Sequence, residues 1–304
     1  MSEDVVARAV AVLRGGGVVA IPTETVYGLA ADVENSAAIA RVFAIKGRPA
    51  EHPLIVHAHD VDALEGFVAE VTPELRALAA RFWPGPLTAV VARGPRTPRS
   101  VTGGQDTVAV RVPEHPLARE ILAAFGGAVA APSANRFGRI SPTRAEHVRA
   151  DLGDAVDVIV DGGPARVGVE STIVDLTGEV PAVLRAGAIT PSQLGEALGT
   201  AVVTRVGGAV RAPGTLRAHY APRARVVLAE QRAREDEARR LAASGERVAV
   251  LTLPDDAAAA ARTLYATLRA LDAEGYDAIV ATLPPDTEPN AAVRDRLTRA
   301  AAAG

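Results

Sequence analysis

The sequence of 304 residues contains no cysteine, which excludes disulfide bonds, thiolate zinc sites, iron–sulfur clusters and a cysteine nucleophile. It has no apolar run that approaches the roughly 18 residues of a membrane-spanning helix. Its first residues include Glu3 and Asp4, where a signal peptide needs positive charge. From these absences we expect a soluble, cytoplasmic protein with no membrane partner.

Several signatures of nucleotide binding and hydrolysis are missing as well. There is no G-x-x-x-x-G-K-[ST] phosphate loop, no G-x-S-x-G elbow and no H-E-x-x-H zinc pair. The glycines at 15–17 precede a predicted strand, whereas a dinucleotide fingerprint follows one. His57 and His59 alternate, which favours one inward and one solvated side chain over a metal pair. A nucleotide site must therefore be assembled from scattered groups, and no protein metal ligand is predicted.

The overall composition is that of an ordinary globular protein. Hydrophobic residues make up 48% of the chain and charged residues 23%, which excludes wholesale disorder. The 33 lysines and arginines are outnumbered by 36 acidic residues, and the formal net charge is -3. A protein that coats nucleic acid normally has the opposite balance. Any anion site must therefore be local.

The order of apolar and amphipathic segments predicts two α/β domains joined by a linker. Residues 1–204 combine many short strands with fewer helices, and the hairpin-length gaps favour a mixed, twisted sheet with flanking helices. Residues 205–223 are rich in glycine, proline and arginine and are expected to be the linker. Residues 224–304 alternate strand and helix three times, which predicts a smaller, Rossmann-like parallel α/β domain.

The apolar runs and periodic segments predict the individual elements. Strands are expected at 18–21, 54–57, 87–92, 107–112, 128–131, 156–160, 172–176, 182–184, 225–228, 248–253 and 278–281. Helices are expected at 3–14, 36–45, 60–69, 73–81, 115–125, 143–150, 191–197, 230–243, 257–273 and 290–303.

Four segments at predicted strand ends combine glycine, proline, hydroxyl and basic residues, as functional loops do. In the first, 21–33, either a strand runs into a helix capped by Thr23 or Thr25, or the Thr25 hydroxyl faces a small polar ligand. In the second, Lys46 and Arg48 either form a solvated helix end or hold one anion together. Both alternatives are open for each segment.

The other two segments are equally ambiguous by themselves. Residues 130–143 place Ser133, Asn135 and Ser141 in a loop that is either a ligand site or an ordinary polar connection before a helix. In the fourth segment Ser171 starts a strand. Arg185 ends another strand, where an arginine usually just reaches water.

Taken in order, these segments resemble one family, the YrdC-type threonylcarbamoyl-AMP synthases. The matching motifs are PTETVYGL, KGRP followed by PLIVH, FWPGPLT, VAVRVP, PSAN, SPT and ESTIVD. They cover nearly the whole of the first two hundred residues. The segment APGTLRAHYAP and the additional α/β domain are similar to the long, two-domain form of this family.

The resemblance implies an enzyme, a nucleotidyltransferase that makes L-threonylcarbamoyladenylate from L-threonine, bicarbonate and ATP and releases pyrophosphate. Mg2+ bound with ATP is the implied cofactor. The product would pass to a tRNA threonylcarbamoyltransferase for tRNA threonylcarbamoyladenosine modification, and direct tRNA binding is expected to be weak or absent. The unstable carbamate requires a site that excludes water and fixes the phosphates between cations. A set of Thr, Ser, Asn, Lys and Arg side chains satisfies that demand without a protein nucleophile.

Matched motif by motif, the resemblance also implies site residues. Arg111 would bind the substrate carboxylate, because its planar fork fits two oxygens. Tyr220 resembles a residue that folds back over the nucleotide, so the linker is hypothesised to be a lid. His52 stands where the family often has asparagine. Threonine contacts are implied for Thr25, His57, Arg111, Ala131 and Ser171, and ATP contacts for Lys46, Arg48, His52, Thr107, Ser133, Asn135, Ser141, Arg185 and Tyr220, with Lys46 and Arg48 acting electrostatically.

Two other functions compete with this interpretation. Carbamoyltransferases of hydrogenase maturation and antibiotic tailoring contain related domains and form carbamoyl-adenylate from carbamoyl phosphate, but their additional regions are not found here. A YrdC-like module that binds double-stranded RNA or tRNA through a basic concave surface is the second alternative, and the negative net charge disfavours it. The oligomeric state and the selectivity for threonine over serine are left open.

Overall fold

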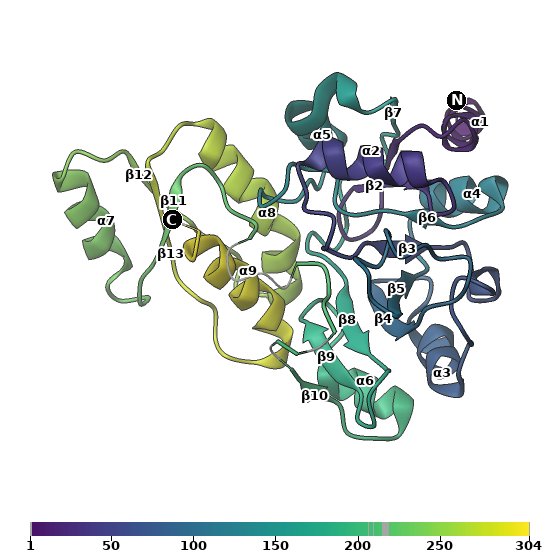
Figure 1. The fold of residues 1–304 in the computed structure, drawn as a ribbon. Coiled ribbons are helices and arrows are strands. Elements are labelled where there is room, and N and C mark those ends of the chain that lie inside the picture. The colour runs from purple at the N-terminus through teal and green to yellow at the C-terminus, as the bar shows by residue number, and fades with distance from the viewer. Residues whose placement is uncertain (1, 206, 209, 215–218, 304) are drawn as a thin grey trace.

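The computed structural model describes residues 2–205, 207–208, 210–214 and 219–303 (Figure 1). Part of the predicted linker, at 206, 209 and 215–218, therefore lies outside the described residues. The described chain forms a ten-stranded mixed sheet with flanking helices and a separate three-stranded parallel sheet. The predicted fold class is confirmed. The domain boundaries at residues 204 and 224 stay a prediction.

The large sheet has the strand order β10-β9-β8-β4-β5-β3-β6-β2-β1-β7. Its pairs β3/β5, β4/β8, β1/β7 and β9/β10 are parallel, and the others are antiparallel. Its elements are α1 Ser2–Arg14, β1 Val19–Ile21, β2 Gly28–Asp32, α2 Ser36–Lys46, β3 Ile55–His57, η1 Asp62–Leu64, α3 Pro73–Phe82, β4 Leu87–Ala92, β5 Thr107–Arg111, α4 Pro116–Phe125, β6 Val129–Ala130, α5 Ala145–Leu152, η2 Gly153–Ala155, β7 Val158–Ile159, β8 Thr172–Asp175, β9 Ala182–Arg185, α6 Pro191–Leu198 and β10 Val203–Thr204.

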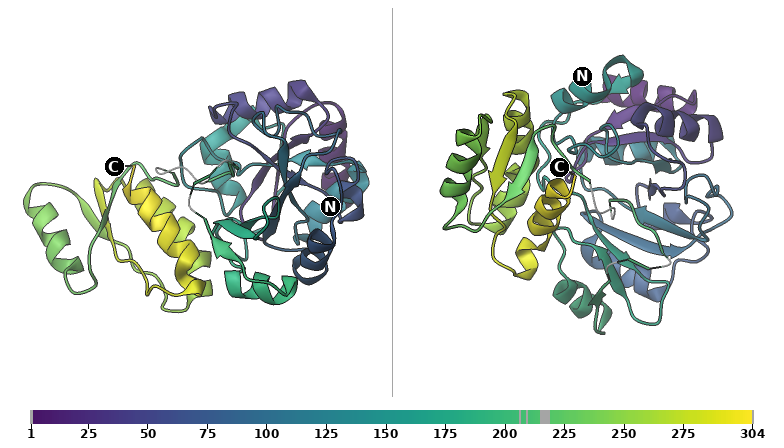
Figure 2. Two further views of the ribbon diagram at one scale, coloured as in Figure 1. Left: turned by 60° about the horizontal axis from the view of Figure 1, so that its bottom comes forward. Right: turned by 60° about the vertical axis from the view of Figure 1, so that its left-hand side comes forward.

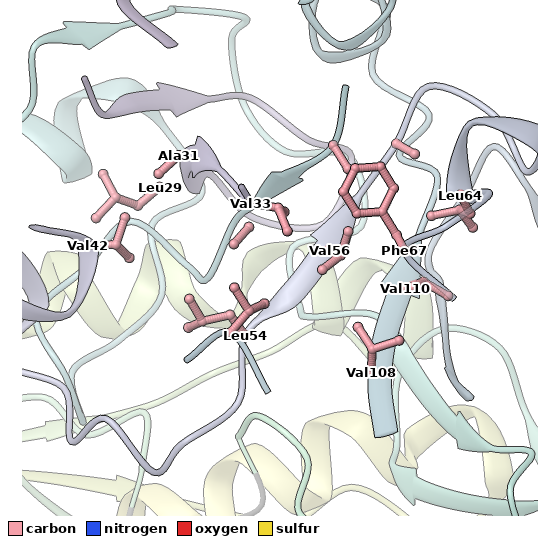
Figure 3. Packing of buried hydrophobic residues seen from close by; sticks show 14 of the residues in the cluster. Leu29, Ala31, Val33, Val42, Leu54, Val56, Leu64, Phe67, Val108 and Val110 are labelled. Atoms are coloured by element: carbon pink, nitrogen blue, oxygen red, sulfur yellow. The ribbon is translucent and has the colours of Figure 1, made fainter. Parts of the chain in front are cut away.

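Both faces of the large sheet are covered, which explains the continuous apolar runs in its strands. Successive side chains of β1 and β2 point to opposite faces. Val19, Ile21 and Ala30 pack against α1 and α4 on one face. Leu29 and Ala31 pack with Val42 of α2 on the other face, in the core that continues to Val56, Phe67 and Val110 (Figure 3).

The end of α2 places two basic residues beside the sheet. Asn35 begins the helix by accepting hydrogen bonds from the backbone N–H groups of residues 37 and 38. Gly47 ends it in the left-handed conformation, with φ of 62°, which favours glycine. Lys46 is therefore the last helical residue, and Arg48 follows the turn. Because the Gly47 turn lies between them, the side chains of Lys46 and Arg48 point in different directions.

The small sheet is parallel, with the order β11-β13-β12. Helix α7 lies on the side of this sheet away from the large one, whereas α8 and α9 lie between the two sheets (Figures 1 and 2). Its elements are β11 Arg225–Leu228, α7 Arg234–Ala243, β12 Val248–Val250, α8 Ala257–Ala273, β13 Ala278–Ala281, η3 Glu288–Asn290 and α9 Ala291–Ala301.

Helices α8 and α9 dock on loops and a helix that flank the large sheet, through an apolar cluster and an ion pair. Val26, Ile140 and Val169 belong to the same buried cluster as Leu264 of α8 and Val293 of α9. At the edge of this cluster the guanidinium of Arg269 pairs with the Asp151 carboxylate at 2.6 Å. The small α/β unit therefore shares a hydrophobic cluster with loops of the larger one, and the two units pack against each other.

Two expectations of secondary structure do not hold: the helical alternative for the segment 21–33 and the helix at 60–69. Residues 28–32 form strand β2 and not a helix, because pairing with β1 and β6 overrides the helix propensity of leucine and alanine. Only residues 62–64 of the predicted helix at 60–69 are helical. Beyond them the N–H groups of residues 67 and 68 still bond back to Leu64, but residues 66, 67 and 69 bond to residues 92–96, at and after the end of β4, and the helix does not continue. Among the described residues, no helix has both the length and the apolar character needed to cross a bilayer.

Candidate active site

A cavity opens where several strands of the large sheet end. His57 and Arg111 are the last residues of the parallel strands β3 and β5, and they stand in register. Arg185 is the last residue of β9, whose partner β8 begins directly after Ser171. Linker residues close one side of the cavity.

Most of the predicted site residues converge on this cavity. Those that line it are Thr25, Arg48, His57, Arg111, Ala131, Ser133, Ser171, Arg185 and Tyr220. Lys46, Asn135 and Ser141 are buried but do not line it, and His52 is half-buried outside it. Thr107 begins β5 and Arg111 ends it, so these two residues are about 13 Å apart along the strand.

The guanidinium of Arg111 is held by three protein acceptors. It donates to Glu24 Oε1 at 2.6 Å, to Thr25 Oγ1 at 2.9 Å and to the backbone oxygen of Gly85 at 3.1 Å. Arg111 and Glu24 form an ion pair whose side chains are only 4% and 3% exposed. These bonds use three of the five N–H groups. One N–H on each terminal nitrogen is not committed to any described residue.

The hydroxyl groups beside Arg111 have a defined direction of hydrogen bonding. Thr23 donates to the carbonyl of Val26 at 2.6 Å, because a carbonyl can only accept. In the contact of 2.9 Å between the two threonine hydroxyls, Thr25 must therefore be the donor. The Thr25 oxygen is left as an acceptor, and one of its lone pairs faces Arg111. The second lone pair is available to an N–H donor such as an amine.

A second arginine connects the sheet to the linker. Arg185 donates to the backbone oxygen of Ser171 through Nε at 3.1 Å and Nη2 at 2.9 Å. Its Nη1 reaches the backbone oxygen of Pro213 at 2.9 Å. Next to Pro213, Gly214 has φ of 76°, and a Cβ there would lie 2.0 Å from the Tyr220 hydroxyl. Only glycine therefore allows the tyrosine to close against this part of the linker.

Lys46 supports a loop of the cavity and does not face the cavity. Its ammonium donates to the backbone oxygens of Ser133 and Asn135 at 2.5 and 2.6 Å. Burial, with a contribution from nearby Arg48, holds the pKa of Lys46 well below its ordinary value. The predicted electrostatic contact of Lys46 with ATP stays a prediction. In this structure its ammonium positions the PSAN loop.

Arg48 faces the cavity beside a row of aromatic rings. It donates to the backbone oxygen of Pro53 at 2.9 Å, and burial lowers its pKa to about 10. The guanidinium lies 5.7 Å from the ring centroid of Phe137, which contacts the rings of His52 and His219. His52 thus reaches the site through Phe137 and not by lining it.

Three functional candidates escaped the sequence analysis: Glu24, Glu170 and His219. Glu170 lines the cavity and accepts hydrogen bonds from Ser141 at 2.5 Å, Tyr265 at 2.9 Å and Arg296 at 2.8 Å. Burial alone would raise its pKa, but the positive charges of Arg296 and Arg185 lower it to about 2. All three lie in or beside the motifs that carry the family resemblance, and this position could have identified them. Glu24 lies inside PTETVYGL, Glu170 opens ESTIVD and His219 precedes Tyr220.

The two cavity histidines are neutral at physiological pH. Burial lowers the pKa of His57 and of His219 to about 3, and Arg111 adds to the effect at His57. His57 Nδ1 lies 3.1 Å from the backbone oxygen of Ile55, so it carries the proton and leaves Nε2 as an acceptor. A neutral imidazole beside the Arg111 guanidinium avoids charge repulsion.

Acid is expected to destabilise the protein through these histidines. The unfolded chain protonates them near their ordinary pKa of 6.5, whereas the folded chain protonates them near 3. Stability is therefore fully present above about pH 6.5 and falls as the pH drops toward 3, by about 1.4 kcal/mol per pH unit and histidine. His57→Gln should reduce the slope by that amount in urea unfolding at several pH values. His59→Gln, partly exposed just past the end of the same strand, is the control. An unchanged slope in His57→Gln would contradict its burial as a neutral group.

Comparison with known proteins gives the family. Residues 11–187 match the Sua5/YciO/YrdC family model, described as "Telomere recombination", and residues 189–302 match the model described as "Threonylcarbamoyl-AMP synthase, C-terminal domain". The threonylcarbamoyl-AMP synthase of Pyrococcus abyssi is 39% identical over 95% of this chain and 91% of its own, and that of Bacillus subtilis is 38% identical over 97% and 92%. A crystal structure of P. abyssi Sua5, described as complexed with L-threonine, has a TM-score of 0.94 at 37% identity and covers 100% of this chain and 95% of that one. With both models matched in chain order and relatives aligned over nearly the full length, the chain belongs to the threonylcarbamoyl-AMP synthase family.

Proposed function

We propose that this protein makes L-threonylcarbamoyl-AMP from L-threonine, bicarbonate and ATP. The threonine amine takes up bicarbonate with loss of water, and a carbamate oxygen then attacks the α-phosphorus of ATP while the bond to the pyrophosphate oxygen breaks. The enzyme is thus an adenylate-forming nucleotidyltransferase. The observation that carries this proposal is one cavity that gathers the hydroxyl and guanidinium groups of separate strand ends beneath the linker.

The threonine subsite is proposed around Arg111, with Thr25, His57, Ala131 and Ser171. The two free N–H groups of Arg111 suit a carboxylate, and the acceptors at Thr25 and His57 suit the ammonium or hydroxyl of the amino acid. Arg48 and Arg185 are proposed to bind phosphate oxygens. Ser133, Ser141, Asn135, His52, Thr107 and Tyr220 keep their predicted ATP roles as part of this proposal.

We propose that Mg2+ arrives with ATP and stays bound to phosphate oxygens and water. Within the part of the chain that the structure describes, no group of three or more histidine or carboxylate side chains is arranged for a metal ion. Glu170, which lines the cavity, and Glu24, which lies behind Arg111, are each paired with an arginine. Mg2+ commonly keeps several waters and substrate phosphates as ligands, which supports a metal carried by the nucleotide.

The product is proposed to pass to a tRNA threonylcarbamoyltransferase. A mixed anhydride of a carbamate and AMP is labile in water, so a second enzyme that accepts the threonylcarbamoyl group must act soon after release. Storage in this cavity until transfer is compatible with a linker lid.

The reaction can be tested with radiolabelled bicarbonate. We expect label to enter an adenylate, with one pyrophosphate released for each, only when ATP, Mg2+, threonine and bicarbonate are all present. Omission of threonine is the control, and serine in its place measures selectivity.

Two results would replace this proposal. Pyrophosphate release that depends on carbamoyl phosphate and ignores threonine would assign a carbamoyl-adenylate-forming carbamoyltransferase. Micromolar tRNA binding with a steep dependence on salt, and no adenylate in any mixture, would assign an RNA-binding module.

A further inference from the structure

Glu170 is an anion in a cavity proposed for a triphosphate. Its carboxylate lines the cavity wall and is almost completely buried. A negative charge at this place repels phosphate unless it is neutralised, because charges interact strongly where water is excluded. The groups that neutralise Glu170 therefore influence ATP binding, whether or not they touch ATP.

The strongest partner of Glu170 comes from a helix 126 residues away in sequence. Arg296 of α9 is fully buried and donates through Nε to Glu170 Oε2 at 2.8 Å. Its Nη2 donates to the backbone oxygen of Ala186 at 3.0 Å, directly after Arg185. Arg296 does not line the cavity. It lies behind the cavity wall and contacts the lining residue Glu170.

Arg296 also supports the linker tyrosine. Its guanidinium lies 5.0 Å from the ring centroid of Tyr220, and Tyr265 of α8 stacks on the same tyrosine at 5.8 Å. Tyr220 has φ of 62°, an uncommon conformation for a residue with a side chain, so its surroundings must hold it there. One arginine thus neutralises the cavity carboxylate and forms part of the support for the residue that closes the cavity.

We propose that Arg296 is a positioning residue of the ATP subsite, and that helix α9 is part of this subsite because it supplies the cation that Glu170 needs. This inference rests on the proposed function. It assigns to the C-terminal α/β unit a role beyond covering the site: without Arg296, Glu170 loses the cation bonded to it, and only the charge of Arg185 offsets its negative charge against the triphosphate.

The other groups around Glu170 do not replace this cation. Ser141 and Tyr265 donate neutral hydrogen bonds. Arg185 contributes positive charge near Glu170, but its described hydrogen bonds go to Ser171 and Pro213 and not to the carboxylate, so it offsets the charge only in part. His219 and Tyr220 also face Glu170, and burial keeps both neutral by lowering the pKa of the histidine and raising that of the tyrosine. Asp295 accepts a second bond from Arg296 at 2.6 Å, but it also pairs with Arg299 at 2.8 Å, so it keeps a cation when Arg296 is replaced.

The test compares the full-length variants Arg296→Met, Glu170→Gln and the double variant, with pyrophosphate release measured as a function of ATP from about pH 6 to pH 9. Arg296→Met should raise the KM for ATP about tenfold at the alkaline end. The ratio of its KM to that of the wild type should shrink toward acid pH, because Glu170 without its arginine takes up a proton more easily. Because the ratio compares two enzymes at the same pH, the effect of ATP ionisation on the KM cancels. The KM for threonine should change much less.

The double variant distinguishes positioning from a merely structural role. Removing the charge of Glu170 together with that of Arg296 should restore the KM for ATP to within about threefold of the Glu170→Gln value and abolish the pH dependence of the ratio. Arg294→Met is the matched control on the same helix, since Arg294 pairs with the exposed Asp286, and its KM should equal that of the wild type. If Arg296→Met does not fold, Arg296→Lys keeps the charge and should show a smaller, pH-independent effect.

The outcomes distinguish a failure of the proposed function from a failure of the role assigned to Arg296. A wild-type protein that makes no adenylate would overturn the proposed function. An active wild type whose Arg296→Met variant has an unchanged KM for ATP, or a raised KM that does not vary with pH and is not restored by Glu170→Gln, would overturn the role of Arg296 alone.

Discussion

Arg111→Ala is expected to raise the apparent KM for threonine about 10- to 150-fold, since hydrogen bonds to a charged group contribute about 1.5–3 kcal/mol and each 1.4 kcal/mol is a factor of ten. The KM for ATP should change by less than about threefold, because Arg48 and Arg185 remain in place. The measurement is initial pyrophosphate release with each substrate varied in turn. Equal effects on both substrates would show that Arg111 does not bind the threonine carboxylate.

The Glu24 carboxylate determines how this experiment must be controlled. Arg111→Ala leaves Glu24 buried without its cation, and breaking a buried pair in this way costs about 3–5 kcal/mol of stability. Arg111→Lys keeps the positive charge but loses the planar fork, so it should fold and still raise the KM for threonine. Glu24→Gln with Arg111 intact should leave an arginine that binds the carboxylate at least as well. A loss of threonine binding in Glu24→Gln alone would show that the carboxylate, and not the arginine, orients the amino acid.

The sequence was informative where the sheet itself brings residues together. The family resemblance placed His57 and Arg111 in one site, and the structure gives the reason, because these residues end two strands that pair in parallel. Lys46 and Arg48 show the limit of this reasoning. From the sequence, these two basic residues either form a solvated helix end or hold one anion together. In the structure Gly47 separates their directions, so that Lys46 is buried and bonds to backbone oxygens while Arg48 faces the cavity.

Sequence patterns could not predict which segments that are distant in the chain contact one another in the fold. Arg296 looks like one of several arginines on an amphipathic helix, and only the docking of α9 beside Glu170 gives it a role. Strand β2 was missed for the same reason. The residues GLAAD favour a helix by propensity, and their extended form depends on two neighbouring strands that are contributed by other parts of the chain. Thr107 matched a motif position but lies at the start of β5, away from the lining residues.

The lid hypothesis predicts the second large effect. Deleting residues 206–304 should reduce turnover about a hundredfold or more, because the carbamate would then be open to water and the partners would be poorly held. This truncation also uncovers the apolar side chains of Val26, Ile140 and Val169 and removes the cation of Glu170. Lost activity in the truncated chain would therefore have several causes, whereas unchanged kinetics would refute the lid outright.

Tyr220→Ala tests the lid without removing the helices that cover the core. Tyr220 lines the cavity, is buried, and reaches the backbone oxygen of Gly214 only at 3.4 Å, so the ring and not the hydroxyl dominates its contacts. Tyr220→Phe should then keep most of the turnover, and Tyr220→Ala should lose about tenfold or more while ATP is partly hydrolysed without forming adenylate. The readout is the ratio of labelled adenylate to released pyrophosphate, which is one for a closed site and falls when water enters. A Tyr220→Ala enzyme that is slow but keeps this ratio at one would show that the tyrosine holds the nucleotide without sealing the cavity.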